Sequence, residues 1–324
     1  MAKRLPEVTK DIWENEIDPF NRQLTEEFLT QGHLSPQTLK QYRSALMQFF
    51  MWVKNNCMNK PLHKLKPRDA LRYQNYLIQE GLSSSAIKFK RSAVSSLCGY
   101  LEIYYLDEYE TFRNIYNKNI PNPPNVKKHE KVPLTKEQFE TLVKELEKRE
   151  RYQEVAYLLY TYATGCRREE SRQLLKEVAD YSKAKDKEGN DKPFYVTHSI
   201  RAKGRGKEGK VRKFTFDERA MTAMKRWLEL RGEDDCPYLF VARSKEGYRQ
   251  ISANMFNHWC SALFSDILGV RVHPHLIRST RATHIVAIDG KDIKSAQKLL
   301  GHASSETTEI YVVRDDSEDL DDIF

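Results

Sequence analysis

Apolar side chains recur at helical spacing through the first third of the chain. Ser35 followed by Pro36 has the form of an N-cap and a first helical residue, so a helix is predicted to begin there. Further helices are predicted from about 66 to Gly81, from Ser83 or Ser84 to about 101, and from 107 to 116. The apolar positions expected to face the core of the first three helices are Leu39, Tyr42, Leu46, Phe49, Phe50 and Val53, then Leu71, Tyr73, Leu77 and Ile78, then Ile87, Val94, Leu97 and Leu101.

A proline-rich segment separates this region from the rest of the chain. Three prolines fall within residues 121–124, and they block both helix and sheet hydrogen bonding. Directly afterwards, Thr135 and Gln138 have the spacing of a capping box, with Leu134 placed as a hydrophobic staple. The predicted organisation is an N-terminal extension (1–19), a four-helix domain (20–118), a linker (119–132), a second domain (133–313) and an acidic tail (314–324).

The second domain has a mixed pattern. Two apolar runs, 194–200 and 211–216, predict strands joined through a glycine-containing turn, and the polar stretch 183–192 predicts a loop. The fold class is therefore mainly α with a small β-hairpin. The predicted helices are 135–148, 152–163, 168–176, 217–231, 252–268, 276–288, 292–299 and 306–313.

Composition narrows the class of protein. With 40% apolar and 31% charged residues among 324, the chain has the make-up of a globular protein, and no apolar run approaches the ~20 residues that span a bilayer. The five cysteines form no CxxC pair, which argues against a disulfide framework or a cysteine zinc site. The N-terminus has no signal-peptide pattern, so a cytoplasmic location is expected.

The net charge of +8 is unevenly distributed. Residues 314–324 contain six acidic residues and one arginine, so the rest of the chain is strongly basic. A basic body with an acidic tail favours a polyanionic partner such as DNA. Among the basic residues on the predicted helices and hairpin, the candidates for DNA contact are Lys40, Arg43, Lys88, Lys90, Arg91, Arg205 and Lys207, although a solvated surface is the simpler interpretation of any one of them.

Four short strings carry the candidate chemistry. His275 and Arg278 lie three residues apart at the start of a predicted helix, which places them on one face. Tyr311 follows His302 by nine residues, and the preceding Leu-Gly closes a helix. In chain order, the strings are Ala-Thr-Gly165-Cys-Arg167-Arg-Glu-Glu170, Arg-Ala-Lys203-Gly, His275-Leu-Ile-Arg278-Ser-Thr-Arg-Ala-Thr-His, and Leu-Gly-His302 with Tyr311 beyond it.

These strings, in this order, resemble the tyrosine recombinase (phage integrase) family. The resemblance implies an N-terminal core-binding, SAM-like helical domain followed by a catalytic domain. It also implies that Tyr311 attacks a DNA phosphate, that Lys203 protonates the leaving oxygen, and that no cofactor or metal is required. The phosphate would be held by Arg167, Arg278, His275 and His302, with Glu170 in a supporting role.

Several assignments within this resemblance stay open. Lys207 or Lys210 could replace Lys203 as the general acid, since Ala202 stands where the family has a glycine. Arg281 and Ser279 also depart from the family pattern. His273 with His275 lacks a third ligand at a spacing suited to a metal.

The implied function is site-specific recombination of duplex DNA at core sites. A homotetramer is expected on DNA. Docking of the acidic tail on a neighbouring copy is one hypothesis for the tail, a frayed end being the other, and an accessory DNA-bending or excision factor is a further candidate partner. A catalytically retired, DNA-binding repressor of the same fold is the main alternative. The sequence does not give the DNA site, the assembly state off DNA, or whether the role is integration of a mobile element or resolution of dimers.

Overall fold

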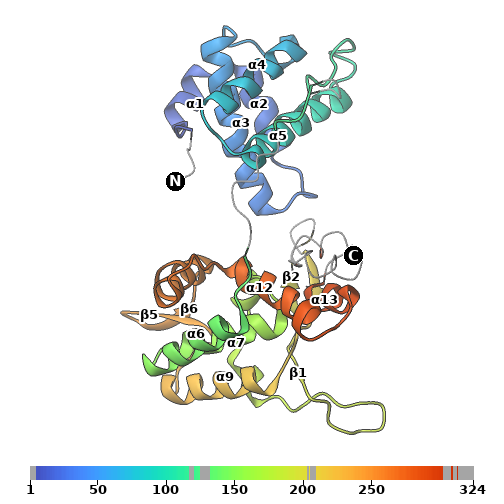
Figure 1. The fold of residues 1–324 in the computed structure, drawn as a ribbon. Coiled ribbons are helices and arrows are strands. Elements are labelled where there is room, and N and C mark those ends of the chain that lie inside the picture. Colours follow the sequence, from blue (N-terminus) through green and yellow to red (C-terminus); the bar gives the residue numbers. More distant parts are fainter. Residues whose placement is uncertain are drawn as a thin grey trace, which may run out of the picture. The chain divides into compact units, whose positions relative to one another are not determined.

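The computed structural model describes residues 5–116, 120–124, 132–202, 204, 209–301, 308 and 312. The chain divides into two compact units (Figure 1). The first comprises Met1–His129 and Gly204–Gly209, and the second comprises Glu130–Lys203 and Lys210–Phe324. Each unit has its own hydrophobic core.

The first unit is helical. Its core centres on large aromatic and aliphatic side chains such as Phe49, Phe50 and Tyr73. Phe49 packs edge-on against Tyr73, with ring centroids 5.0 Å apart. The helices are α1 (Lys10–Glu16), α2 (Pro19–Phe28), α3 (Pro36–Asn56), η1 (Leu62–Lys64), α4 (Pro67–Gln79) and α5 (Ser84–Tyr104).

The start of α3 confirms the signal read from the sequence. The Ser35 side chain accepts a hydrogen bond from the backbone amide of Thr38, and Pro36 occupies the first helical position. The start of α5 repeats the pattern, with Ser83 as N-cap. Side-chain capping satisfies amides that a helix leaves without partners, which is why these serines mark helix starts.

The prediction of a helix over 107–116 is wrong. This segment forms turns, and the Asn114 side chain explains part of the difference. Its amide nitrogen donates to the carbonyl of Ser95, and its oxygen accepts from the amide of Tyr116. Such side-chain bonds offer the backbone an alternative to helical pairing. Helices α1 and α2, which the apolar spacing did not reveal, form instead at the N-terminal side of the unit.

Two residues predicted to face the core of α4 do not. Leu71 is 38% exposed and Ile78 is 40% exposed, whereas Tyr73 and Leu77 are fully buried. The buried face of α4 is therefore narrower than the face predicted from the positions of its apolar residues.

The second unit contains both helices and short strands. Its strands pair antiparallel as β1 with β4, β2 with β3, and β5 with β6. The helices are α6 (Lys136–Lys148), α7 (Tyr152–Thr164), α8 (Arg168–Ser171), η2 (Lys176–Asp180), α9 (Glu218–Arg231), α10 (Ala253–His258), η3 (Trp259–Phe264), α11 (Ser265–Leu268), α12 (Pro274–Thr283), η4 (His284–Ile288) and α13 (Ile293–Leu300). The strands are β1 (Tyr195–Val196), β2 (Ile200–Ala202), β3 (Lys210–Arg212), β4 (Thr215–Phe216), β5 (Val241–Ser244) and β6 (Gly247–Gln250).

The predicted hairpin is present in two pieces. Residues of the first run pair with residues of the second, as Tyr195 with Phe216 and Ile200 with Arg212. Between the pieces, the amide of Thr197 donates to the carbonyl of Phe214 at 2.9 Å, so the two runs stay together. The β5–β6 hairpin was not predicted.

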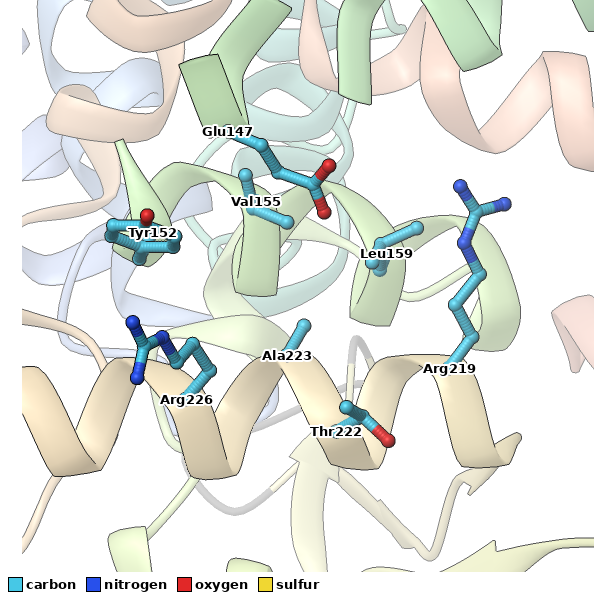
Figure 2. Close-up of a pocket in the computed structure, with 8 residues that line it drawn as sticks. All are labelled: Glu147, Tyr152, Val155, Leu159, Arg219, Thr222, Ala223 and Arg226. Carbon is cyan, nitrogen blue, oxygen red and sulfur yellow. The ribbon is translucent and has the colours of Figure 1, made fainter. Parts of the chain in front are cut away.

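Helices α7 and α9 run side by side, and a cavity of about 280 Å³ opens where they meet α6 (Figure 2). Val155, Leu159 and Ala223 line its apolar part. Two α9 arginines, Arg219 and Arg226, stand at its margins (Figure 2).

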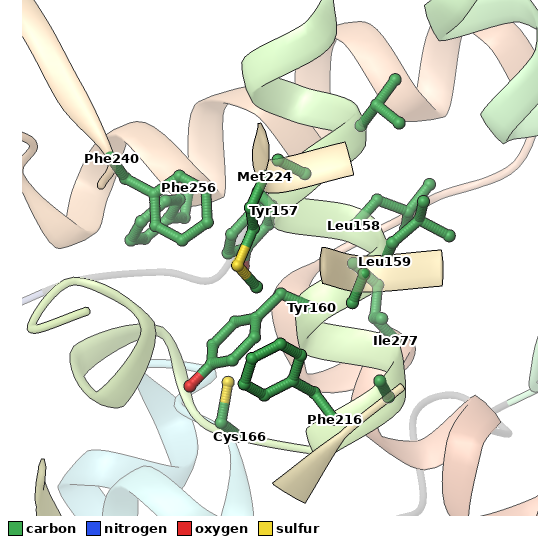
Figure 3. Packing of buried hydrophobic residues seen from close by; sticks show 14 of the residues in the cluster. Tyr157, Leu158, Leu159, Tyr160, Cys166, Phe216, Met224, Phe240, Phe256 and Ile277 are labelled. Atoms are coloured by element: carbon green, nitrogen blue, oxygen red, sulfur yellow. The ribbon is translucent and has the colours of Figure 1, made fainter. Parts of the chain in front are cut away.

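Aromatic rings fill the core of the second unit (Figure 3). Tyr157 of α7 stacks on Phe256 of α10, with ring centroids 4.2 Å apart and planes 7° from parallel. Tyr160, one turn further along α7, packs edge-on against Phe216 of β4. Helix α7 is thus the central element of this unit, and its C-terminal end leads directly into the segment that carries Arg167.

The start of the second unit is tied to α12 through His284. Its Nε2 donates to the carbonyl oxygen of Leu134 at 2.8 Å, so its Nδ1, 2.7 Å from the Tyr162 hydroxyl, is the acceptor of that bond. The amide of Leu134 donates to the Thr280 hydroxyl. The capping box predicted at Thr135 and Gln138 follows directly and is confirmed.

We expect the second unit to lose stability as the pH falls below about 6.5, the ordinary pKa of histidine. Burial lowers the pKa of His284 in the folded protein, while its hydrogen bond to the Leu134 carbonyl raises it and the nearby Arg281 lowers it. The unfolded chain therefore binds the proton first, and stability that is present above pH 6.5 is lost as the pH decreases. One such group contributes a slope of at most about 1.4 kcal/mol per pH unit.

Urea unfolding of wild type and His284→Gln between pH 5 and 8 measures this effect. The variant should show a weaker dependence of unfolding free energy on pH, because glutamine does not titrate. Equal pH dependence in both proteins would contradict the assignment. His258→Gln is the matched control in the same unit, because His258 lies exposed on α10, and it should leave the pH dependence of wild type unchanged.

Candidate active site

Among the predicted catalytic residues that the structure describes, Arg278 is the most deeply buried, at 1% exposure. It lies on α12, and its Nη2 donates to the carbonyl of Leu300 at 2.8 Å. Its Nη1 donates to the carbonyl of Gly165, a residue 113 positions earlier in the chain. A guanidinium carries five N–H donors in a fixed plane, so one side chain can fasten two backbone segments at once.

Arg167 lies at the N-cap of α8, two residues after Gly165. Glu170 holds it from two directions. One carboxylate oxygen accepts from the Arg167 amide at 2.6 Å, and the other accepts from its Nη1 at 3.1 Å. Glu170 is 1% exposed, so this pair is fixed and largely shielded from solvent.

The turn at Gly165 brings the two arginines into one region. Gly165 adopts a left-handed conformation at the end of α7, with φ of +58°. A Cβ atom at this position would lie 2.5 Å from Cδ2 of Leu300, so the close packing of α13 against this turn requires glycine.

His275 lies in the first turn of α12, where its side chain is exposed. Pro274 precedes it at the first helical position, and the His273 side chain caps the helix by accepting from the Leu276 amide at 3.1 Å. His275 and Arg278 therefore share the N-terminal half of α12, the first facing solvent and the second buried.

Five of the predicted site residues lie outside the described residues. They include the predicted nucleophile, and none of their positions is part of the geometry above. They are Lys203, Arg205, Lys207, His302 and Tyr311. Lys210, the other candidate general acid in the hairpin, is described at the start of β3.

Arg212 is a residue of this region that the sequence did not single out. It lies at the end of β3, and its two terminal nitrogens donate to the carbonyls of Leu300 and Leu299 at 2.9 and 2.8 Å. Burial lowers the pKa of Arg212, the charge of Glu170 raises it, and that of Arg167 lowers it. The hairpin motif Lys-Val-Arg gave no hint of this role, because the partners of Arg212 lie 87 and 88 residues away.

Cys166 lies between Gly165 and Arg167, yet it is a poor candidate for a nucleophile. Burial raises the pKa of its thiol to about 11, and the nearby Glu170 acts in the same direction. A thiol that stays protonated at neutral pH is unreactive.

The DNA-contact candidates of the first unit fall into two groups. Lys40 and Lys88 are exposed. Arg43 instead pairs with Glu26 through two hydrogen bonds of 2.5 and 2.6 Å. Lys90 donates to Gln48, and burial lowers its pKa. Arg91 donates to Gln74 and to the carbonyls of Ile120 and Pro121.

Across the described residues, no group of three or more histidine, cysteine, aspartate or glutamate side chains has a geometry suited to a metal ion. In the same part of the chain, no helix combines the length and the apolar character that a membrane span requires.

Family comparisons match both units. The model described as "Phage integrase family" matches residues 133–318. A second model, "Phage integrase, N-terminal SAM-like domain", matches residues 22–102.

Individual relatives have recombinase names. The chain is 35% identical to the SPbeta prophage-derived recombinase-like protein YomM of Bacillus subtilis, over 100% of this chain and 96% of that protein. It is 30% identical to the tyrosine recombinase XerA of Pyrococcus furiosus, over 75% of each chain.

The fold matches solved integrase structures at low sequence identity. The Tn1549 transposon integrase in complex with transposon right end DNA has a TM-score of 0.68 at 19% identity, with 94% of this chain and 98% of that chain covered. A lambda integrase dimer bound to a core site has a TM-score of 0.62 at 14% identity, with 89% and 95% covered.

Proposed function

Since the chain belongs to the phage integrase family and is therefore a tyrosine-type site-specific recombinase, we propose that it cleaves and rejoins duplex DNA with Tyr311 as nucleophile. The single observation that carries the proposal is the meeting of two arginines from distant parts of the chain. Arg278 donates to the carbonyl of Gly165, and Arg167 follows that glycine by two residues.

Two fixed arginines suit the chemistry of a phosphodiester. A guanidinium keeps its charge at neutral pH and presents paired donors that match phosphate oxygens. Held in place by Glu170 and by backbone carbonyls, the arginines need little rearrangement as negative charge develops on the phosphate. Preorganised charge of this kind is a large source of rate acceleration.

In the proposed reaction, the Tyr311 oxygen attacks the phosphorus while the bond to the 5′ oxygen breaks. The product is a 3′-phosphotyrosine and a free 5′ hydroxyl. Lys203 supplies the proton to the departing oxygen, and His275 accepts the proton from Tyr311. His302 donates to a phosphoryl oxygen. A 5′ hydroxyl from the partner strand then reverses the step, so no nucleotide is consumed.

The DNA partner is supported by the solved relatives, which are complexes with transposon right end DNA and with a core site. We propose that the first unit contributes contacts through exposed lysines such as Lys40 and Lys88. Arg43, Lys90 and Arg91 have partners within the protein and serve the unit's packing first.

We further propose that four copies assemble on paired DNA sites and that the acidic tail docks on a neighbouring copy. The tail alternates acidic residues with apolar ones at Leu320, Ile323 and Phe324, which suits a protein surface better than DNA. Native gel analysis of the DNA complex with and without residues 315–324 tests the docking, and unchanged assembly would contradict it.

Integration or excision of a mobile element is the biological role that we favour over dimer resolution. The prophage-derived relative aligns over the full length of this chain, whereas the XerA relative aligns over three quarters of it.

The test of the proposed function uses a pool of duplexes with one nick and randomised bases on either side of it. After cleavage close to the nick, the short leaving fragment diffuses away, so the covalent complex accumulates. Protein-linked DNA is recovered under denaturing conditions and sequenced, and the attached peptide is identified by mass spectrometry. We expect DNA on the peptide that contains Tyr311. DNA binding without any covalent product would instead support the repressor alternative.

A further inference from the structure

Arg212 contacts the end of the helix that leads into His302. Helix α13 ends at Leu300, and its last carbonyls have no partner within the helix. Arg212 reaches them from β3, donating to the carbonyls of both Leu299 and Leu300. A positive charge at a helix C-terminus also interacts favourably with the helix dipole.

The Leu300 carbonyl is a shared acceptor. It receives Nη1 of Arg212 at 2.9 Å and Nη2 of Arg278 at 2.8 Å. A carbonyl oxygen has two lone pairs, so it can accept both bonds. Through this one atom, the hairpin strand β3 and the catalytic helix α12 hold the same end of α13.

Gly301 leaves the space that this contact needs. Its φ is +65°, and a Cβ atom there would lie 1.9 Å from Nη1 of Arg212. Any side chain at position 301 would therefore displace the guanidinium. Phe214 also packs against Arg212, with its ring centroid 4.3 Å from the guanidinium carbon.

We propose that Arg212 is a positioning residue for the recombination reaction, fixing the end of α13 so that the segment beginning at His302 enters the active site in register. This inference rests on the proposed roles of His302 and Tyr311. In this proposal, Arg212 acts through the backbone of α13, to whose carbonyls both of its terminal nitrogens donate. The salt dependence of DNA binding distinguishes this role from a phosphate contact.

The experiment uses the duplex recovered with wild-type protein and compares Arg212→Met with wild type in single-turnover cleavage. We expect the cleavage rate to fall about 10- to 100-fold, since misplacing a reacting group by about 1 Å costs up to about 10²-fold. DNA affinity should change less than about twofold, and the slope of affinity against salt should stay the same. A residue that bound phosphate would reduce that slope by about 1.

Two further variants separate positioning from a general loss of folding. Arg212→Lys keeps the charge but offers a single donor nitrogen in place of two, so it should recover part of the lost rate. Gly301→Ala keeps Arg212 but displaces its guanidinium. The losses of cleavage rate in Arg212→Met and Gly301→Ala should therefore not add when both changes are combined in one protein. Arg226→Met is the matched control, because Arg226 lies on α9 and pairs with Glu229 at the surface.

Three outcomes would overturn the inference. One is a wild-type cleavage rate in both Arg212→Met and Gly301→Ala. Another is a rate loss accompanied by a reduced salt slope, which would place Arg212 on the phosphate. The third is an equal loss in Arg226→Met. If wild-type protein forms no covalent product, the proposed function fails instead, before any Arg212 variant is compared.

Discussion

Replacing Tyr311 with phenylalanine is expected to abolish covalent attachment to DNA while leaving DNA binding within about twofold of wild type. The change removes only the hydroxyl oxygen that would bond to phosphorus. Loss of the nucleophile in enzymes with covalent intermediates lowers turnover by about 10⁶-fold, so no adduct should be detectable. Gel separation under denaturing conditions measures the adduct, and a mobility-shift assay measures binding.

Tyr248→Phe provides the matched control, because Tyr248 lies on β6 and stacks with Arg231 within the second unit. This variant should form adduct at the wild-type rate. An adduct that persists in Tyr311→Phe, attached to another side chain, would assign the nucleophile elsewhere.

Arg278→Ala is expected to lower the cleavage rate by at least about 10³-fold and to destabilise the second unit as well. Removal of an arginine that stabilises a phosphoryl transition state costs about 10³- to 10⁵-fold in other phosphoryl-transfer enzymes. The truncation also removes the Arg278 donor from the buried Gly165 carbonyl, whereas the Leu300 carbonyl keeps its bond from Arg212. Each buried polar group left without its partner costs about 1–3 kcal/mol.

Arg278→Lys separates these effects. A single ammonium cannot reproduce the planar fork that joins two backbone segments, so we expect it to restore charge but less than a tenth of the activity. Single-turnover cleavage is measured together with thermal unfolding. Arg281→Ala is the control on the same helix, since Arg281 pairs with Asp289 at 3.0 Å. Cleavage by Arg278→Ala within tenfold of wild type would contradict the assignment.

Helices with strong local signals were predictable from the sequence. The capping residues Ser35 and Thr135 mark the starts of α3 and α6, because their side chains accept hydrogen bonds from amides three residues further along the chain. The 107–116 segment was not predictable in this way. Its conformation depends on Asn114, whose amide donates to Ser95 on a different element.

The residues of the candidate site also differ in whether local sequence or a long-range contact reveals them. Arg167 and Arg278 were found because they belong to short strings whose order resembles a known family, and the structure describes both. Arg212 was missed because its role arises only when β3 meets the end of α13. Contacts between residues 88 positions apart leave no periodic signal in the sequence.

The two separate hydrophobic cores have a consequence for the evolution and engineering of this two-unit protein. Among the residues that the structure describes, the core of the first unit is made of side chains from positions 13–120 and that of the second of side chains from 134–277, with none in common. A gene fusion that replaces the first unit, with its junction between residues 124 and 132, would keep every residue of the second core. Under the proposed function, we expect such a chimaera to keep the chemistry of the second unit and to differ from the natural protein in the DNA contacts of the replaced unit.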